Sequence, residues 1–164
     1  MKYGLAPVPG TSLYVALSGE EAIASLFLTE APDLARQCDP AFDRLAHKAA
    51  AWISEGVPFT HHVQLSGTPF QRAVYALVAT IPEGTVTTYR DVASRLGTRG
   101  YRAVGQALNK NPLLLLIPCH RVISSDGTLG GFAHGTEMKA RILRGEGVGI
   151  EDGRVAPSCI RPLP

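Results

Sequence analysis

Short apolar segments separated by polar turns occupy the first part of the chain. Apolar residues fill most of positions 12–17 and 23–28, and the polar run at 18–21 separates them. Two apolar segments on either side of a glycine-containing polar turn are typical of a β-hairpin. The pattern therefore predicts a small sheet near the start of the chain.

A helix is expected next, because apolar residues then recur at intervals of three and four. Asp39 is suited to cap its first turn and Pro40 to stand at its first position. Gly56 and Pro58 mark its end. The expected inward face consists of Phe42, Leu45, Ala46, Ala49, Trp52 and Ile53. Sheet and helix together predict an α/β domain over residues 1–66.

The clearest helix signal in the chain follows. Thr68 and Gln71 have the spacing of a capping box, and Pro69 stands at the first helical position. Behind them, helical spacing is kept by Phe70, Val74, Leu77, Val78 and Ile81. We predict a helix that begins at Pro69.

Two short helices are predicted after a turn at residues 82–84. Thr88 and Asp91 form a second capping pattern, and Gly97 ends the helix that starts there. Another helix fits residues 101–110. Such a pair suits a helix-turn-helix that meets nucleic acid, and it equally suits an ordinary helical hairpin.

The helix at residues 101–110 is unusually rich in small side chains. Gly105 in its interior costs about 1 kcal/mol relative to alanine. Close approach to a nucleic-acid groove would account for this glycine, and so would tight packing on the helix that begins at Pro69.

A mainly α domain is completed by two further elements. Residues 113–117 are expected to be buried, and a last helix is expected at 136–144. The domain then covers residues 67–150, and residues 151–164 form a tail.

Charge divides along the chain although the net charge is only +2. Residues 1–66 hold four Lys or Arg against seven Asp or Glu, whereas residues 67–150 hold ten against five. A basic half suits a polyanionic partner, because neutralised phosphates release counterions, but it also suits a solvated surface. No apolar run approaches the roughly 20 residues of a membrane span. We expect a cytoplasmic protein, or a nuclear one in a eukaryote.

The three cysteines include one with unusual neighbours. They form no CxxC pair, which argues against a disulfide scaffold and a structural zinc site, so we expect no metal. We also expect no cofactor. His120 and Arg121 directly follow Cys119, and positive neighbours favour the reactive thiolate. Adjacent side chains of an extended segment point to opposite faces, so contact between His120 and the thiol needs a turn or a bridging water.

The segment Pro118-Cys119-His120-Arg121-Val122 resembles the active-site signature of the O6-alkylguanine-DNA alkyltransferases, a family of single-turnover DNA-repair proteins. The similarity runs from about Phe70 to Gly147, in the family's order. It includes Thr88-Tyr89, Arg102-Ala103-Val104-Gly105, Asn111-Pro112 and Gly145-Glu146-Gly147. The resemblance implies a ribonuclease H-like N-terminal domain and a helix-turn-helix in the C-terminal domain.

The chemistry that the resemblance implies is transfer of an alkyl group from O6-alkylguanine in DNA to the protein, with O4-alkylthymine as an open second substrate. Cys119 would keep the group as a thioether, and His120 would activate the thiol through water. Glu146 would orient the imidazole. Asn111 would support the turn around the thiol, and Lys139 falls where the family places a lysine near the site.

The implied partner is alkylated double-stranded DNA, bound mainly through its minor groove by a monomer. A buried thiol cannot reach a base inside a duplex, so the guanine is expected to flip out while Arg102 fills its place in the stack. Tyr89 is expected to donate a proton to the guanine and to contact the DNA backbone. Further DNA contacts are implied for Thr88, Ala103, Gly105 and Arg121.

The implied substrate pocket is lined by Leu114, Val122, Phe132 and Ala133. Phe132 stands where many members of the family have tyrosine, and Ala133 where many have serine. Stacking on the base survives these differences, but hydroxyl contacts to the base do not.

Two other functions fit parts of the pattern. A thiol hydrolase would also use a cysteine, a histidine and a glutamate, although no separate oxyanion-hole motif is evident. A damage-recognition protein without transfer activity is the second alternative. Proteins of that kind lack the acceptor cysteine, whereas Cys119 is present here.

Overall fold

The computed structural model describes residues 1–30, 38–57 and 61–163, and the chain divides into two compact units. Unit 1 comprises Met1–Ser66 and Pro112–Leu116, and unit 2 comprises Gly67–Asn111 and Ile117–Pro164. Among the described residues, no helix is both long and apolar enough to cross a membrane.

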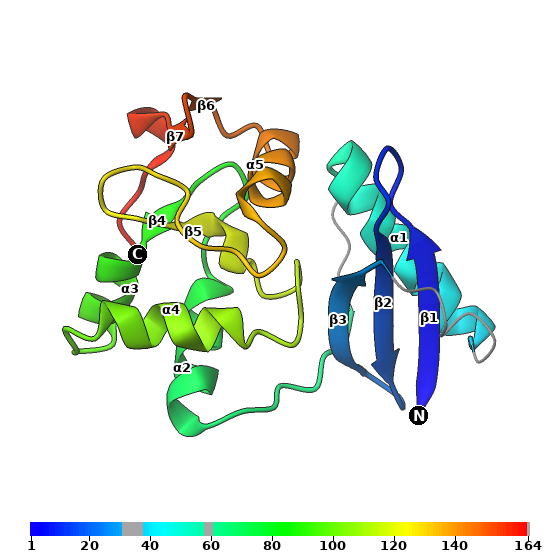
Figure 1. The fold of residues 1–164 in the computed structure, drawn as a ribbon. Helices are drawn as coiled ribbons and strands as arrows, with labels where there is room; N and C mark the ends of the chain where they lie inside the picture. The colour runs from blue at the N-terminus through cyan, green and yellow to red at the C-terminus, as the bar shows by residue number, and fades with distance from the viewer. Residues whose placement is uncertain (31–37, 58–60, 164) are drawn as a thin grey trace. The chain divides into compact units, whose positions relative to one another are not determined.

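Unit 1 is a three-stranded antiparallel sheet with one helix packed on it (Figure 1). The strands are β1 (Lys2–Pro7), β2 (Tyr14–Gly19) and β3 (Ile23–Thr29), in that order across the sheet. The hairpin formed by β2 and β3 confirms the prediction from the apolar segments. Strand β1 was not predicted from the sequence.

The helix of unit 1, α1 (Pro40–Glu55), has the ends that its sequence predicts. The Asp39 side chain accepts hydrogen bonds from the first turn, and Gly56 ends the helix in the left-handed conformation. The helix packs closely on β1 at Gly4, where a Cβ would lie 2.1 Å from the carbonyl oxygen of Phe42. Gly4 therefore allows the backbone of the helix to approach the sheet.

The segment Pro112–Leu116 belongs to unit 1 because it pairs with β3. The Leu26 amide donates to the Pro112 carbonyl at 2.7 Å, and the Leu114 amide donates to the Leu26 carbonyl at 2.9 Å. Leu113, Leu114, Leu115 and Ile117 are buried, as predicted, whereas Leu116 is only partly buried.

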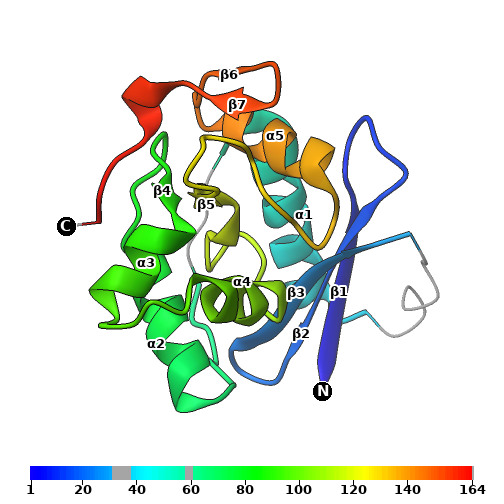
Figure 2. The same cartoon turned by 60° about the vertical axis from the view of Figure 1, so that its left-hand side comes forward.

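Unit 2 is built mainly from helices: α2 (Pro69–Val78), α3 (Tyr89–Arg95), α4 (Tyr101–Asn109) and α5 (Thr136–Gly145). The capping box of α2 is present, with the Thr68 amide donating to the Gln71 side chain at 2.8 Å. The Thr88 hydroxyl accepts from the Asp91 amide at 3.1 Å and caps α3. Helix α4 packs against both α2 and α3 (Figure 2).

Unit 2 also contains a short parallel β-ladder that was not predicted from the sequence. Strand β4 (Thr87–Thr88) pairs with β5 (Val122–Ile123). Because β4 leads directly into α3 and β5 directly follows the Cys119 segment, the ladder ties the start of α3 to that segment.

Residues 151–163 are part of unit 2 and not the separate tail that the sequence predicts. A hairpin joins β6 (Ile150–Glu151) to β7 (Arg154–Val155), with positive φ at Asp152 and Gly153. The chain after it pairs with Val86, whose amide donates to Cys159 and whose carbonyl accepts from Arg161. Residues with apolar side chains hold the segment in the core, because Val155 is buried and Ile160 packs on the same cluster.

Candidate active site

Cys119 lies at the start of a single 3-10 turn, η2 (Cys119–Arg121), in unit 2. The Cys119 amide donates to the Ile117 carbonyl at 2.7 Å, and the Arg121 amide donates to the Pro118 carbonyl at 2.9 Å. The chain is therefore tightly turned where the reactive sequence lies. The thiol is buried, with 7% of the residue exposed.

The surroundings of Cys119 act on its thiol in opposite directions. Burial raises the pKa of the thiol, while a hydrogen bond from Asn111, the charge of Lys139 and nearby backbone N–H groups lower it. Burial has the larger effect. Asn111 also donates from Nδ2 to the Ile117 carbonyl at 2.9 Å, which ties the end of α4 to the turn. The thiol keeps its proton at neutral pH, so reaction requires a base.

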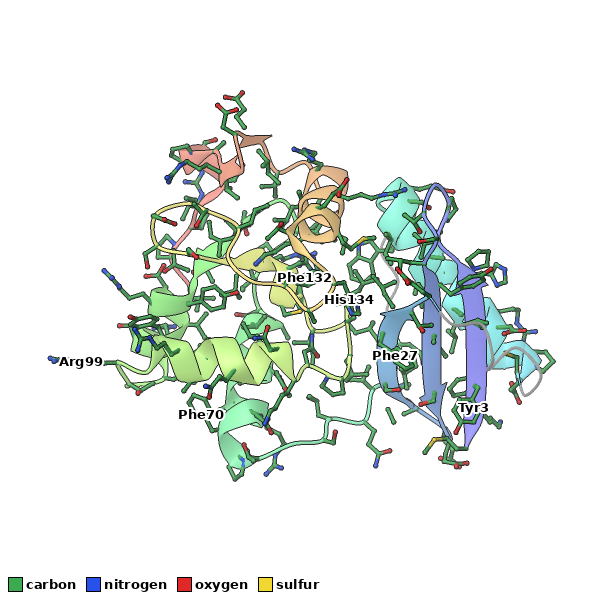
Figure 3. The ribbon with its side chains drawn as sticks, in the orientation of Figure 1. Tyr3, Phe27, Phe70, Arg99, Phe132 and His134 are labelled. Atoms are coloured by element: carbon green, nitrogen blue, oxygen red, sulfur yellow. The ribbon has the colours of Figure 1, made fainter. Side chains whose placement is uncertain are left out.

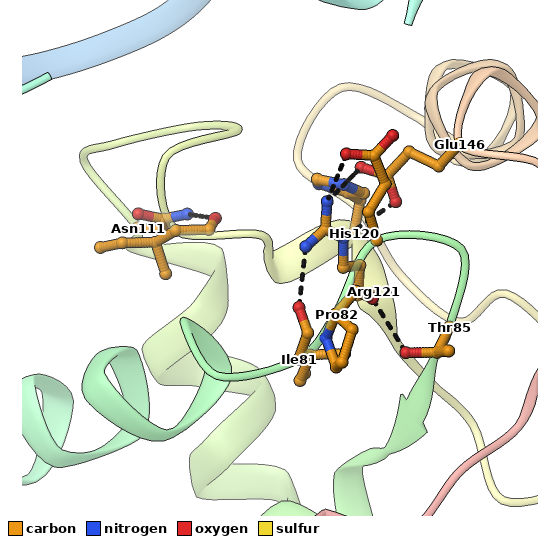
Figure 4. Close-up of polar contacts among 9 residues, drawn as sticks. Ile81, Pro82, Thr85, Asn111, His120, Arg121 and Glu146 are labelled. Atoms are coloured by element: carbon orange, nitrogen blue, oxygen red, sulfur yellow. Dashed lines mark hydrogen bonds and ion pairs between the residues drawn. The ribbon is translucent and has the colours of Figure 1, made fainter. Parts of the chain in front are cut away.

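His120 and Glu146 meet inside unit 2, as the sequence analysis expects (Figure 4). Nε2 of His120 lies 2.8 Å from Oε1 of Glu146, and 0% and 1% of the two side chains are exposed. A carboxylate only accepts hydrogen bonds, so Nε2 carries the ring proton. Nδ1 of His120 is buried and has no hydrogen-bond partner among the described residues. The imidazole thus has a lone pair available on Nδ1.

Arg121 lies where its side chain does not fit the expected contact with DNA. Its side chain is only 9% exposed and points into unit 2. Nε and Nη2 donate to the two oxygens of Glu146 at 2.9 and 2.7 Å, and Nη1 donates to the Ile81 carbonyl at 2.8 Å. A guanidinium this deeply buried must have its charge met by the protein, which is why it binds Glu146.

Lys139 is fully buried on α5. Its Nζ donates to the carbonyls of Val122 and Leu129, both at 2.6 Å. Burial lowers the pKa of Lys139 to about 8, and a charge on Cys119 opposes this shift. The ammonium group lies 5.8 Å from the centre of the Tyr89 ring. Lys139 therefore links the residues around the thiol to Tyr89.

Tyr89 stands at the first position of α3 and is partly buried. Burial, followed by the Cys119 charge, raises the pKa of its phenol to about 12. The hydroxyl donates to the Gly131 carbonyl at 3.3 Å. The phenol therefore stays protonated near neutral pH and remains a hydrogen-bond donor.

Helix α4 presents an open surface. Tyr101, Arg102 and Ala103 are exposed, and the Arg102 guanidinium lies 5.9 Å from the centre of the Tyr101 ring. A Cβ on Gly105 would lie 3.9 Å from its nearest neighbour, a carbon of Tyr89. That distance is an ordinary contact, so tight packing on α2 does not account for the glycine.

The remaining predicted site residues lie in different places. Thr88 is 8% exposed and caps α3. Val122 is buried in β5, Ala133 is exposed, and Leu114 belongs to unit 1.

Phe132 packs its ring edge-on against His134 with centroids 5.9 Å apart (Figure 3). His134 was not among the residues expected at the site. Its position two residues after Phe132 in a glycine-rich loop was the available signal.

Comparisons with known proteins identify the family of this chain. The family model for the DNA-binding domain of 6-O-methylguanine DNA methyltransferase matches residues 69–148. A methylated-DNA–protein-cysteine methyltransferase of Saccharolobus islandicus is 43% identical over 116 residues, 70% of this chain and 75% of the relative. Its counterpart in Sulfolobus acidocaldarius is 39% identical over 150 residues, 91% of this chain and 95% of the relative.

A solved structure adds evidence at the level of the fold. The crystal structure of Mycobacterium tuberculosis OGT in complex with DNA aligns with a TM-score of 0.77 and 30% identity, over 89% of this chain and 92% of that one. Sequence and fold therefore agree over most of the chain, which belongs to the methylated-DNA–protein-cysteine methyltransferase family.

Proposed function

We propose that this protein repairs DNA by moving the alkyl group of O6-alkylguanine onto its own Cys119, once per molecule. The observation that carries the proposal is a buried thiol next to His120, whose ring is held by Glu146 with a free lone pair on Nδ1. A nucleophile, a base and a group that orients the base are the parts that such a reaction needs.

The reaction balances with the groups present. His120 takes the thiol proton through a water molecule, and the Cys119 sulfur attacks the carbon bonded to guanine O6. A sulfur–carbon bond forms while the carbon–oxygen bond breaks, and its electron pair passes to the guanine. Because a thioether has no ready route back to a thiol, one molecule repairs one lesion.

Tyr89 supplies the proton that the departing guanine needs. Its raised pKa keeps the phenol protonated at neutral pH, and the buried cation of Lys139 faces its ring at 5.8 Å. A nearby positive charge stabilises the phenolate that forms when the proton leaves.

Helices α3 and α4 act as a helix-turn-helix that places α4 in the minor groove of duplex DNA. The exposed small side chain of Ala103 and the open surface at Gly105 support close approach to DNA. The protein acts as a monomer. It flips the damaged guanine out of the duplex, and Arg102 takes the place of that base in the stack. The M. tuberculosis relative was solved in complex with DNA, which supports this partner.

The finer structural assignments follow from the same family. We assign the sheet and helix of unit 1 to the ribonuclease H-like class and the site of action to the cytoplasm, or to the nucleus in a eukaryote. The described residues include no group of three metal-ligating side chains, and the chemistry proposed here uses no cofactor.

Intact-protein mass spectrometry tests the proposal directly. The protein is incubated with an oligonucleotide that contains O6-methylguanine, and a second reaction contains O4-methylthymine. We expect one methyl group on the native protein, none on Cys119→Ser, and one on the control Cys159→Ser. Repeated turnover would favour a hydrolase, and an unmodified protein that binds the lesion would favour damage recognition.

A further inference from the structure

Arg121 joins three segments of unit 2 inside the protein. Its Nη1 binds the carbonyl of Ile81, which lies in the turn after α2, while Nε and Nη2 bind Glu146 at the end of α5 (Figure 4). A Cβ on Gly84 in the same turn would lie 3.2 Å from the Glu146 carbonyl, so these segments also touch directly. The guanidinium thus has little freedom, and it holds the carboxylate in one orientation.

The Glu146 carboxylate is shared unequally between two donors. Among the described residues, Oε2 accepts from Arg121 alone, whereas Oε1 accepts from Arg121 at 2.7 Å and from His120 at 2.8 Å. Arg121 and Glu146 already form a neutral pair. A proton added to buried His120 would create a further charge with no counter-ion of its own.

The other charged groups near His120 act in the same direction or lie farther away. Lys139 on α5 is positive and disfavours an imidazolium, as Arg121 does. Glu83 lies 4.0 Å from Arg121, but its side chain is 41% exposed, so solvent screens it. Cys119 is neutral until it loses its proton. Burial is the largest influence and lowers the pKa of His120.

We propose that Arg121 is a positioning residue for alkyl transfer, which keeps His120 neutral with its proton on Nε2 and its Nδ1 lone pair ready for the thiol proton. The reaction that this arrangement serves rests on the proposed function. When the proton moves from the Cys119 sulfur to Nδ1, an imidazolium and a thiolate form together. Glu146 stays ionised throughout, since Arg121 holds its charge.

The proposal differs from the simpler view in which Glu146 alone assists His120. A lone buried carboxylate favours the protonated ring, and a ring that already carries two protons cannot act as a base. Arg121 limits this effect and leaves the orienting hydrogen bond in place. Arg121 therefore allows Glu146 to orient the His120 ring without making the ring more readily protonated.

Nitrogen-15 NMR of the histidine rings tests the state of His120 in the unmodified protein. We expect a neutral ring protonated on Nε2 at pH 7, with titration well below that of a free histidine. An imidazolium at pH 7, or a neutral ring protonated on Nδ1, overturns the proposal. The measurement requires no alkyl transfer, so it remains decisive if the proposed function fails.

Variants at Arg121 test the consequence for reactivity. Arg121→Met removes the charge, Arg121→Lys retains it, and Arg144→Met removes a surface arginine of α5 as a matched control. Single-turnover rates with an O6-methylguanine oligonucleotide are measured from pH 5.5 to 8.5. Thermal unfolding of each variant identifies any that do not fold. If a variant does not fold, the NMR result on the unmodified protein decides whether the proposal stands.

Only Arg121→Met is expected to move the pH profile. We expect its acidic limb to shift upward by about one unit, which lowers the rate on that limb about tenfold. Arg121→Lys should restore most of the profile, and Arg144→Met should match the unmodified protein. An equal loss of rate at every pH in Arg121→Met would leave Arg121 a purely structural role and overturn the proposal.

Discussion

Two arginines of unit 2 occupy opposite environments. All three guanidinium nitrogens of Arg121 are hydrogen-bonded to protein groups, and its side chain is nearly inaccessible. Arg102 is exposed at the start of α4 and lies over the ring of Tyr101. A buried charge must be compensated within the fold, whereas an exposed one remains available to a partner. The same residue type thus supports the chemistry in one place and suits DNA binding in the other.

The largest effect is expected from a substitution in the buried pair of Arg121 and Glu146. Glu146→Gln keeps the shape of the side chain but leaves the Arg121 charge without its counter-ion. We expect a loss of about 3–5 kcal/mol in the free energy of unfolding, measured with urea. Alkyl transfer should also slow on the order of a hundredfold, because the base loses the negative charge that stabilises its imidazolium.

A matched control for that change is Glu137→Gln on the same helix. Glu137 is exposed in the first turn of α5, where a carboxylate contributes at most about 1 kcal/mol through the helix dipole. If Glu146→Gln were no more destabilising than this control, the buried pair would have no special role in the fold.

Arg102→Ala tests the exposed side of the comparison. We expect the rate of alkyl transfer from a duplex to fall about tenfold or more. Without Arg102, nothing fills the gap that the flipped base leaves, so the free energy of flipping is not offset. Reaction with the free base O6-benzylguanine should be unaffected, and the free energy of unfolding should change by less than about 0.5 kcal/mol. Equal losses on both substrates would remove the proposed role in the stack.

The smallest expected effect is that of Gly105→Ala, which tests whether the exposed surface of α4 approaches DNA. The added methyl group has room beside Tyr89, and alanine favours the helix by up to about 1 kcal/mol. We therefore expect a higher unfolding midpoint together with weaker binding to duplex DNA, measured by fluorescence anisotropy. A stabilised variant that binds DNA as well as the original protein would show that this part of α4 does not approach DNA.

Elements with strong local signals could be predicted from the sequence. The first residues of α1 and α2 were identified from Asp39 and Thr68, because a capping side chain bonds to backbone groups only two or three residues away. Strands β4 and β5 were missed, since each has two residues and exists only through its distant partner. The Asp152-Gly153 turn was a usable hairpin signal that the sequence analysis passed over.

The candidate site shows the same division. The order Cys119-His120-Arg121 marks reactive chemistry, and resemblance to a known family brings Glu146 into it. The sequence does not show that Arg121 points inward, because an arginine followed by valine suits a surface strand as well as a buried turn. Its inward direction depends on Ile81 and Glu146, which lie 40 and 25 residues away along the chain.

By itself, the sequence determined the first residues of the capped helices, the basic second half and the candidate reactive cysteine. Those features depend on short-range hydrogen bonding, on composition, and on the order of residues in a motif that resembles a known family. Tertiary structure alone decided which charges are buried, that His120 meets Glu146, and that the last residues belong to unit 2. The physical reason is that desolvation and charge pairing depend on neighbours in space, which the fold brings together from distant parts of the chain.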